Sequence, residues 1–254
     1  MTPILEARRL SRSFGHVRAL DGADFDVQPG EIAGLIGDNG AGKSTLIKAL
    51  SGNLDLDDGE IYFNGDRVRL SGPRHAAQLG IEVVYQDLAL APHLNPVQNV
   101  FLGREISRKG ILGYLGFMDE KAMRRSAAES FAELGATVKS LTAPVGSMSG
   151  GQRQGIAIAR AMAWANKVLI LDEPTAALGV VQTNNVLESI KRVRDKGIAV
   201  VFISHSMPHV LEVCDRIQVL RLGKRVATYE GQQTSVEELV GAMTGALDSR
   251  EGAA

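Results

Sequence analysis

The residues most suggestive of chemistry form the glycine-rich run GDNGAGKST at positions 37–45. The run fits G-x-x-x-x-G-K-[ST], a pattern whose backbone N–H groups surround the phosphates of a nucleoside triphosphate. Its lysine supplies a mobile positive charge for the outer phosphates, and its serine offers a hydroxyl to Mg²⁺. The residues predicted to bind the nucleotide are Gly37, Asp38, Asn39, Gly40, Ala41, Gly42, Lys43, Ser44 and Thr45.

The flanking residues favour a phosphate-binding loop over a plain glycine-rich turn. An apolar run at 32–36 precedes the glycines, and Leu46–Leu50 follows them with helical spacing. A helix that begins near Lys43 directs the positive end of its dipole at the same phosphates. We therefore predict that the chain binds a nucleoside triphosphate.

A second candidate is the pair of carboxylates, Asp172 and Glu173, that follows the apolar run at 168–171. Ligand groups of α/β proteins lie at the C-terminal ends of parallel strands, so Asp172 is predicted to hold Mg²⁺ through water. Glu173 is predicted to orient and deprotonate the attacking water. Such a pair is as often only a polar strand end, and the upstream phosphate loop favours the catalytic interpretation.

A second anion-binding helix start is predicted at Ser149, Gly150 and Gly151, in the run MSGGQRQ. Serine is a good N-cap residue, and the two glycines leave backbone N–H groups bare. An ordinary capped helix has the same residues, so this run alone does not decide between structure and binding.

The elements expected to position these candidates form an α/β core that a helical segment interrupts. The later apolar runs alternate with helices, which is typical of a parallel sheet, and Asn64-Gly65 predicts a hairpin turn. Glycines punctuate residues 104–117, which are expected to be irregular. Strands are expected at 4–10, 17–27, 32–36, 61–63, 81–85, 168–171, 199–204 and 217–221, and helices after the glycine-rich run, at 95–102, 119–134 and 149–164, and from a capping box at 235–238.

The length of 254 residues suits one large domain with an insertion. Residues 1–86 and 163–254 are predicted to form the nucleotide-binding core, with antiparallel strands near its start. Residues 87–162 are predicted to form a helical subdomain that carries MSGGQ.

Composition excludes several classes of partner and setting. The net charge of −1 gives no electrostatic case for a nucleic-acid or acidic-membrane partner. Cys214 is the single cysteine, which excludes an internal disulfide and favours a reducing, cytoplasmic setting. We expect no signal peptide, and no run approaches the roughly 18 apolar residues that cross a bilayer. Any membrane role is therefore expected to come through a partner.

Five motifs occur in a fixed order: GDNGAGKST, Tyr85-Gln86, MSGGQ, LILDEPTAAL and ISH. In this order the chain resembles the ATP-binding subunit of an ABC transporter over nearly its whole length. Longer stretches, such as GDNGAGKSTLIKALSG and SGGQRQGIAIARA, are similar to the bacterial monosaccharide importer branch, and the single-domain arrangement is closest to its fructose type. The resemblance implies an ABC-type phosphate-loop core with a mixed sheet, an antiparallel β subdomain and an inserted helical subdomain.

The resemblance also implies roles for residues that would otherwise be read as structural. Phe14 is expected to stack on adenine, and His205 to contact the γ-phosphate. Gln86 is expected to meet Mg²⁺ and the γ-phosphate and to link the site to a membrane partner. The implied catalytic residues are Glu173, His205 and Gln86; the implied metal ligands are Ser44, Gln86 and Asp172; and the implied signature, which contacts ATP on another copy, is Met148, Ser149, Gly150, Gly151 and Gln152.

The implied assembly is a head-to-tail homodimer with two composite ATP sites, each needing Mg²⁺. The further implied partners are integral-membrane permease subunits and, indirectly, a periplasmic sugar-binding protein, at the cytoplasmic face of the inner membrane. Nucleic acid is not expected as a partner. Two alternatives share the core motifs: the ATPase of an exporter or lipid transporter, and a soluble ABC ATPase acting on the ribosome or nucleic acid.

Two residues depart from the family pattern. Met148 stands where leucine is usual, which conserves volume. Gly179 stands where the pattern ends in aspartate, so the chain lacks that carboxylate at the expected dimer interface. We expect Gly179 to loosen the coupling between the two sites without abolishing hydrolysis.

Overall fold

The computed structural model describes residues 2–136, 138, 140–176 and 178–246. The described chain divides into two compact units. The first comprises the described parts of residues 1–83, 165–173 and 190–254, and the second comprises those of 84–164 and 174–189.

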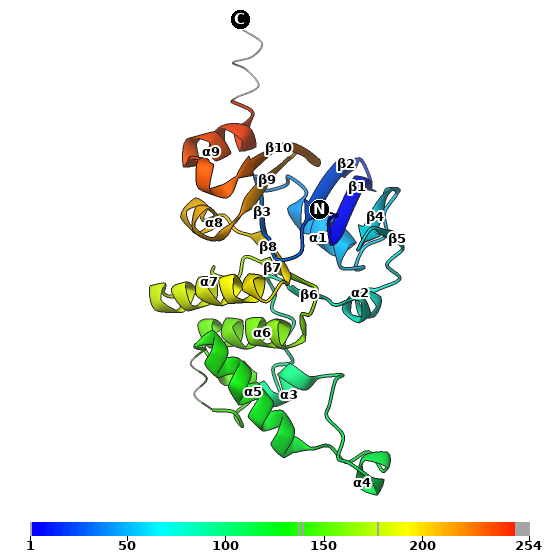
Figure 1. Ribbon diagram of the computed structural model, residues 1–254, viewed down its shortest axis with the longest axis vertical. Helices are drawn as coiled ribbons and strands as arrows, with labels where there is room; N and C mark the ends of the chain where they lie inside the picture. Colours follow the sequence, from blue (N-terminus) through cyan, green and yellow to red (C-terminus); the bar gives the residue numbers. More distant parts are fainter. Residues whose placement is uncertain (1, 137, 139, 177, 247–254) are drawn as a thin grey trace, which may run out of the picture. The chain divides into compact units, whose positions relative to one another are not determined.

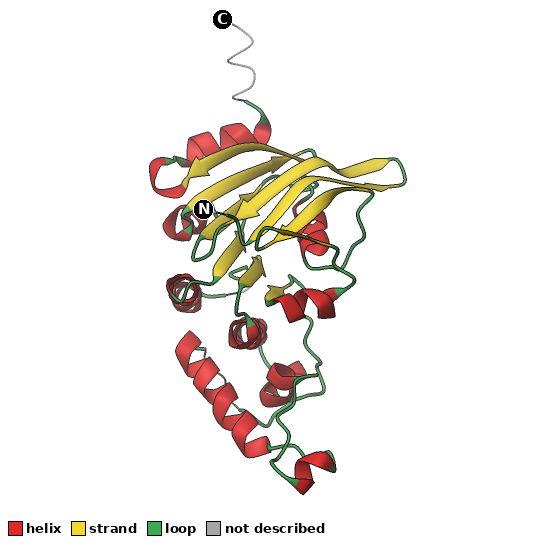
Figure 2. Cartoon of the chain, turned by 45° about the vertical axis from the view of Figure 1, so that its right-hand side comes forward, coloured by secondary structure: helices red, strands yellow, loops and turns green. Residues whose placement is uncertain are grey.

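The first unit contains an antiparallel sheet with the strand order β2-β1-β4-β5 (Figures 1 and 2). The predicted turn at Asn64-Gly65 joins the last two strands, and both residues have the positive φ that a tight hairpin requires, 53° and 87°. The strands are β1 (Leu5–Phe14), β2 (Val17–Val27), β4 (Asp58–Phe63) and β5 (Asp66–Val68).

A second sheet of the same unit has the order β10-β9-β3-β8-β7-β6. Strands β9, β3, β8 and β7 are parallel, whereas β10 is antiparallel to β9, so the sheet is mixed as expected. Every residue of β3 and β8 is buried, which explains their unbroken apolar sequences. The strands are β3 (Ile32–Ile36), β6 (Ile81–Val84), β7 (Val168–Asp172), β8 (Ala199–Ile203), β9 (Arg216–Arg221) and β10 (Lys224–Glu230).

The helices of the first unit are α1 (Lys43–Leu50), α2 (Pro73–Leu79), α8 (Met207–Val213) and α9 (Val236–Thr244). Helix α9 begins with the predicted capping box between Ser235 and Glu238. Helix α2 and strand β10 were not predicted from the sequence. Leu79 ends α2 and Ile81 begins β6, with only Gly80 in its left-handed conformation between them.

An ion-pair network joins the two sheets of the first unit. The Arg216 guanidinium lies 2.6 Å from an Asp26 carboxylate oxygen and 2.7 Å from Glu31, and Arg225 lies 2.7 Å from Asp26. Burial acts to raise the pKa of Asp26, but hydrogen bonds from Arg216 and Arg225 outweigh it, so the pKa lies below its usual value. These pairs tie β2 to β9 and β10.

The second unit is mainly helical. The segment 104–117, expected to be irregular, contains the one-turn helix α4, so that prediction is wrong. Gly110 precedes this helix with a φ of 74°, a conformation that favours glycine. The Arg108 N–H donates to the Phe117 carbonyl at 2.9 Å, so the segment has an ordered local structure. The helices are α3 (Pro96–Phe101), α4 (Ile111–Tyr114), α5 (Glu120–Leu134), α6 (Gly150–Trp164) and the part of α7 (Val180–Asp195) up to Ser189.

Candidate functional site

The glycine-rich loop connects β3 to α1 and packs closely on neighbouring backbone. Gly37 has a φ of 156°, and a side chain there would collide with the Leu220 carbonyl oxygen. Gly42 has a φ of 106°, and its side chain would collide with the Ala19 carbonyl oxygen. Glycine is therefore needed at both positions for conformation and for space.

Helix α1 begins at Lys43 with no side-chain cap and no acidic residue in its first turn. Its first backbone N–H groups therefore have no partner within the helix, and they lie at the positive end of the helix dipole. Ser44 and Thr45 follow in the same turn. An anion such as a phosphate fits this end of the helix.

The Lys43 side chain is only 9% exposed and folds back onto the loop. Its Nζ donates to the carbonyl oxygens of Gly37 at 2.6 Å and Asp38 at 3.1 Å. Burial lowers the pKa of this ammonium, and the negative charges of Glu173 and Asp172 oppose that shift. The loop lysine and the two carboxylates are thus electrostatic neighbours in the first unit.

The pairing of β7 with β8 brings the two carboxylates and His205 to one edge of the sheet. Asp172 pairs with Ile203, and the Glu173 N–H donates to the Ile203 carbonyl at 3.0 Å. The His205 Nε2 lies 3.4 Å from Glu173 Oε1. Glu173 has a φ of 52°, which is a strained conformation for a residue with a side chain and is common at functional sites.

Burial raises the pKa values of both carboxyls at this edge. For Glu173, whose side chain is 13% exposed, the Asp172 charge adds to the rise, and His205 and Lys43 oppose it. For Asp172, the positive charges of Lys43, His205 and Lys48 oppose the rise. A carboxylate with a raised pKa is a stronger base, which suits removal of a proton from water.

Phe14 lies at the end of β1 and is 49% exposed. The guanidinium of Arg12 lies 5.2 Å from its ring centroid. An exposed ring of this kind offers a surface on which a planar base can stack.

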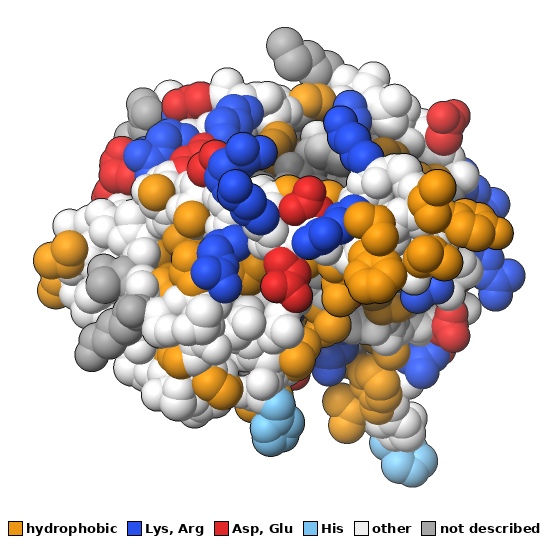
Figure 3. Space-filling model, turned by 90° about the horizontal axis from the view of Figure 1, so that it is seen from below, with side chains coloured by type: hydrophobic (Ala, Val, Ile, Leu, Met, Phe, Trp, Pro, Cys, Tyr) orange, Lys and Arg blue, Asp and Glu red, His pale blue; other side chains and the backbone are white. Residues whose placement is uncertain are grey.

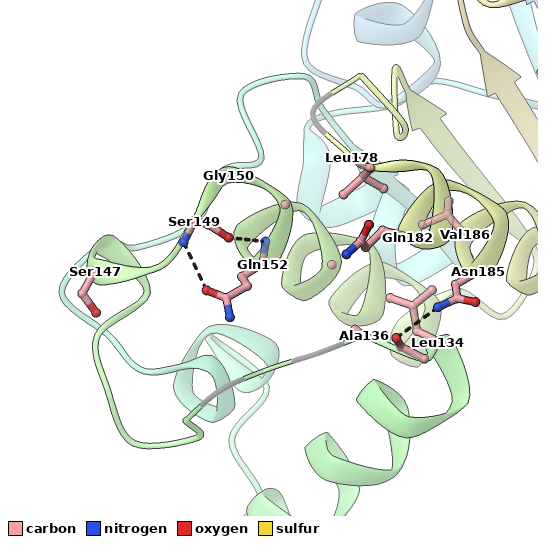
Figure 4. Close-up of a pocket in the computed structure, with 14 residues that line it drawn as sticks. Leu134, Ala136, Ser147, Ser149, Gly150, Gln152, Leu178, Gln182, Asn185 and Val186 are labelled. Carbon is pink, nitrogen blue, oxygen red and sulfur yellow. Dashed lines mark hydrogen bonds between the residues drawn. The ribbon is translucent and has the colours of Figure 1, made fainter.

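Gln86 and the signature run belong to the second unit. Gln86 is exposed in the turn that follows β6. Ser149 and Gln152 cap α6 reciprocally: the Gln152 N–H donates to Ser149 Oγ at 3.4 Å, and the Ser149 N–H donates to Gln152 Oε1 at 3.2 Å (Figure 4). Met148 precedes this cap, and a side chain at Gly150 would meet nothing within 4 Å.

A cavity of about 800 Å³ lies beside this helix start (Figure 4). Away from the signature, its lining includes Leu178 and Gly179, at the end of the carboxylate motif, and also residues that the motifs do not mark. Among the latter, the Asn185 side chain donates to the Gly135 carbonyl at 3.4 Å. Nothing in the sequence pattern points to Gly135 and Asn185, because only folding brings them near the signature. The lining includes Ser149, Gly150, Gly151, Leu134, Gly179 and Gln182.

Comparison with known proteins agrees with this geometry. A family model described as ABC transporter matches residues 20–176. The chain belongs to the ABC transporter family. It is therefore an ATP-binding ATPase of that family, which confirms the predicted fold class and enzyme class.

Three relatives match this ABC ATPase over nearly its whole length. The fructose import ATP-binding protein FrcA of Rhizobium meliloti is 50% identical, over 97% of the chain and 95% of the relative. The xylose/arabinose import ATP-binding protein XylG of Sulfolobus acidocaldarius is 42% identical, over 96% and 95%. The ribose import ATP-binding protein RbsA 1 of Burkholderia ambifaria is 43% identical over 96% of the chain, which spans 47% of that relative. These relatives favour neither the exporter nor the non-transport alternative.

Solved structures give the same fold. The chain superposes on MJ1267, an ATP-binding cassette of an ABC transporter, with a TM-score of 0.79 at 25% identity, covering 95% of this chain and 99% of that one. It superposes on the ATP-binding cassette MJ0796, solved as a dimer with ADP and phosphate, with a TM-score of 0.78 at 22% identity, covering 90% and 99%. None of the helices in the described residues is both long and apolar enough to span a bilayer.

Proposed function

We propose that the chain is the ATP-hydrolysing subunit of an ABC importer for a monosaccharide of the fructose, xylose or ribose type. One observation carries the proposal: Lys43, Glu173 and His205 are neighbours in a chain that is 50% identical to a fructose import ATP-binding protein. The α/β core predicted at 1–86 and 163–254 would hold the nucleotide, and the helical subdomain at 87–162 would carry the signature.

In the proposed reaction, the loop N–H groups and Lys43 hold the phosphates of ATP, and Phe14 stacks on its adenine. Glu173 accepts a proton from water while the water oxygen bonds to the γ-phosphorus. The bond from that phosphorus to the β,γ-bridging oxygen breaks, and ADP keeps its electron pair. His205, beside Glu173, contacts the γ-phosphate and places it for attack.

The donor set at this site suits Mg²⁺. A hydroxyl from Ser44 and a carboxylate from Asp172, both in the first unit, are hard oxygen donors, and phosphate oxygens of the nucleotide and water would complete the shell. The amide oxygen of Gln86, in the second unit, is the further ligand that the family resemblance implies. Bound there, Mg²⁺ would neutralise part of the phosphate charge. Ser44 and Asp172 are thus the proposed metal ligands of the first unit.

We further propose that the functional ATPase is a homodimer. The signature helix α6 begins beside a cavity of about 800 Å³, and the positive end of its dipole suits the phosphates of an ATP held by another copy. ATP would then bridge the two subunits, and its hydrolysis would remove that bridge.

The proposed permease contact is an exposed apolar patch around α4. The side chains of this patch are between 46% and 93% exposed, with Tyr114 the most exposed. Figure 3 shows hydrophobic side chains gathered on the right-hand side of the face seen from below. A patch of this kind marks an interaction surface. Its members are Ile111, Leu112, Tyr114, Leu115, Phe117 and Met118.

Docking through this patch would place the chain at the cytoplasmic face of the inner membrane. A periplasmic sugar-binding protein would deliver the sugar to the permease from the other side. The near-neutral net charge of −1 gives no reason to add nucleic acid to these partners.

The proposed function is tested by uptake of labelled fructose, xylose and ribose in bacterial cells that lack the gene. The wild-type chain is expected to restore uptake of one of these sugars and to co-purify with a membrane permease. A chain that restores no uptake and is recovered with ribosomes or DNA would refute the importer proposal.

Gly179 gives a more specific prediction about the dimer. Its carbonyl accepts the Thr183 N–H at 2.9 Å, so it immediately precedes α7, while the neighbouring Ala177 lies outside the described residues. A side chain at Gly179 would meet only the Gln182 Oε1, at 2.8 Å, which is the end of a flexible side chain that can move. Aspartate therefore fits at this position.

Gly179→Asp is expected to raise the Hill coefficient for ATP from about 1 toward about 2, because it restores a carboxylate at the expected interface. Hydrolysis rates measured against ATP concentration check this. Gly179→Asn, which has the same size without the charge, is the matched control. The coupling hypothesis fails if Gly179→Asp leaves both turnover and cooperativity at wild-type values.

A further inference from the structure

We propose that Arg160 is a positioning residue for Gln86. It ties the turn that carries Gln86 to helix α6, so that the signature at one end of this helix and the turn at its other end move together. The inference rests on the proposed function, because it gives a purpose to the roles assigned above to Gln86 and the signature. All the residues involved lie in the second unit.

The link consists of two hydrogen bonds from one side chain. The Arg160 guanidinium donates through Nη1 to the Ala89 carbonyl at 2.8 Å and through Nη2 to the Leu88 carbonyl at 3.1 Å. The Leu88 N–H donates to the Tyr85 carbonyl at 2.9 Å and closes the turn around Gln86. The planar guanidinium of Arg160 thus uses both of its terminal nitrogens to hold two consecutive carbonyls.

Two residues of this turn have a strained backbone conformation. Leu88 has a φ of 62° and Ala89 a φ of 44°, and both carry side chains that disfavour the left-handed region. Two strained residues in succession persist only where the surroundings hold them. The Arg160 hydrogen bonds go to the carbonyls of these same two residues, so the side chain holds the strained conformation directly.

Helix α6 is suited to transmit movement to this turn. Ser149 caps its first turn, and its residues from Gln154 to Ala159 are buried. At its far end the Trp164 Nε1 donates to the Val100 carbonyl at 2.8 Å. Arg160 lies eleven residues after Ser149, which is about 16 Å along a helix. A rigid helix of this length would move Arg160 whenever its first turn shifts onto ATP held by another copy.

The first test measures the turn without any activity. Hydrogen exchange of the peptide covering residues 85–90 is compared in the full-length wild type, Arg160→Met and Arg125→Met. Arg125 is an exposed arginine on α5 and serves as the matched control. We expect Arg160→Met to speed exchange in this peptide and Arg125→Met to leave it unchanged. Unchanged exchange in Arg160→Met would overturn the proposal, whether or not the chain hydrolyses ATP.

The second test is a double-mutant cycle with Gln86→Ala. Arg160→Met alone is expected to lower kcat between about tenfold and a hundredfold, with little change in KM for ATP, because misplaced groups slow the chemical step. In the Gln86→Ala background it is expected to have no further effect. A full additional loss in that background would show a merely structural role.

Arg160→Lys keeps the charge and guards against a folding failure in Arg160→Met. Its single nitrogen cannot bond both carbonyls in the same planar geometry, so an intermediate loss of kcat is expected. If Arg160→Lys has the wild-type kcat and the wild-type exchange rate, the two terminal nitrogens of the guanidinium are not needed to hold the turn. If the wild-type chain does not hydrolyse ATP, the proposed function is refuted. The hydrogen-exchange result then still tests whether Arg160 holds the turn that carries Gln86.

Discussion

Replacing Glu173 with glutamine is expected to lower the rate of ATP hydrolysis by at least about a hundredfold while leaving ATP binding intact. Glutamine keeps the size and the neighbours of the side chain, but its amide cannot accept the proton of the attacking water. Because ATP persists, the head-to-tail dimer is expected to accumulate. Phosphate release measures the rate, and size-exclusion chromatography with ATP measures the dimer.

The control is Glu129→Gln, which changes an exposed glutamate on α5 and is expected to hydrolyse ATP at the wild-type rate. If Glu173→Gln also hydrolyses at that rate, Glu173 is not the base. If the rate falls but no dimer accumulates with ATP, the proposal that ATP bridges two copies is wrong, and the assignment of the base stands.

Replacing Lys43 with alanine is expected to weaken ATP binding by about a hundredfold. The buried ammonium already bonds two loop carbonyls, and phosphate oxygens would replace or join them with charge-assisted bonds, which are stronger than neutral ones. Losing one such group at a phosphate costs roughly 1.5–3 kcal/mol. Titration calorimetry with ATP and Mg²⁺ gives the dissociation constants.

Lys121→Ala, an exposed lysine on α5, is the matched control for Lys43→Ala and is expected to bind ATP as the wild type does. Thermal unfolding of both variants separates lost binding from lost folding. An unchanged dissociation constant for a folded Lys43→Ala would mean that the loop N–H groups alone supply the affinity.

Most of the fold could be predicted where the signal is local or periodic. The unbroken apolar runs at 32–36 and 199–203 became the fully buried strands β3 and β8, since a strand covered on both faces has no polar side. The hairpin at Asn64-Gly65 formed where it was predicted. Helix α4 was missed because glycine was taken as a breaker there, whereas Gly110 supplies the backbone conformation that starts the turn.

The sequence by itself determined the phosphate loop, because its requirements are local: glycines where a side chain cannot fit, then lysine and serine at the first turn of a helix. Only the tertiary structure decided which distant groups meet. His205 lies 3.4 Å from Glu173 because β7 and β8 are parallel neighbours. Arg160 reaches the turn beyond Gln86 across 71 residues of sequence, because α6 packs in the same unit. Such contacts depend on how whole elements pack, and no short stretch of residue types encodes them.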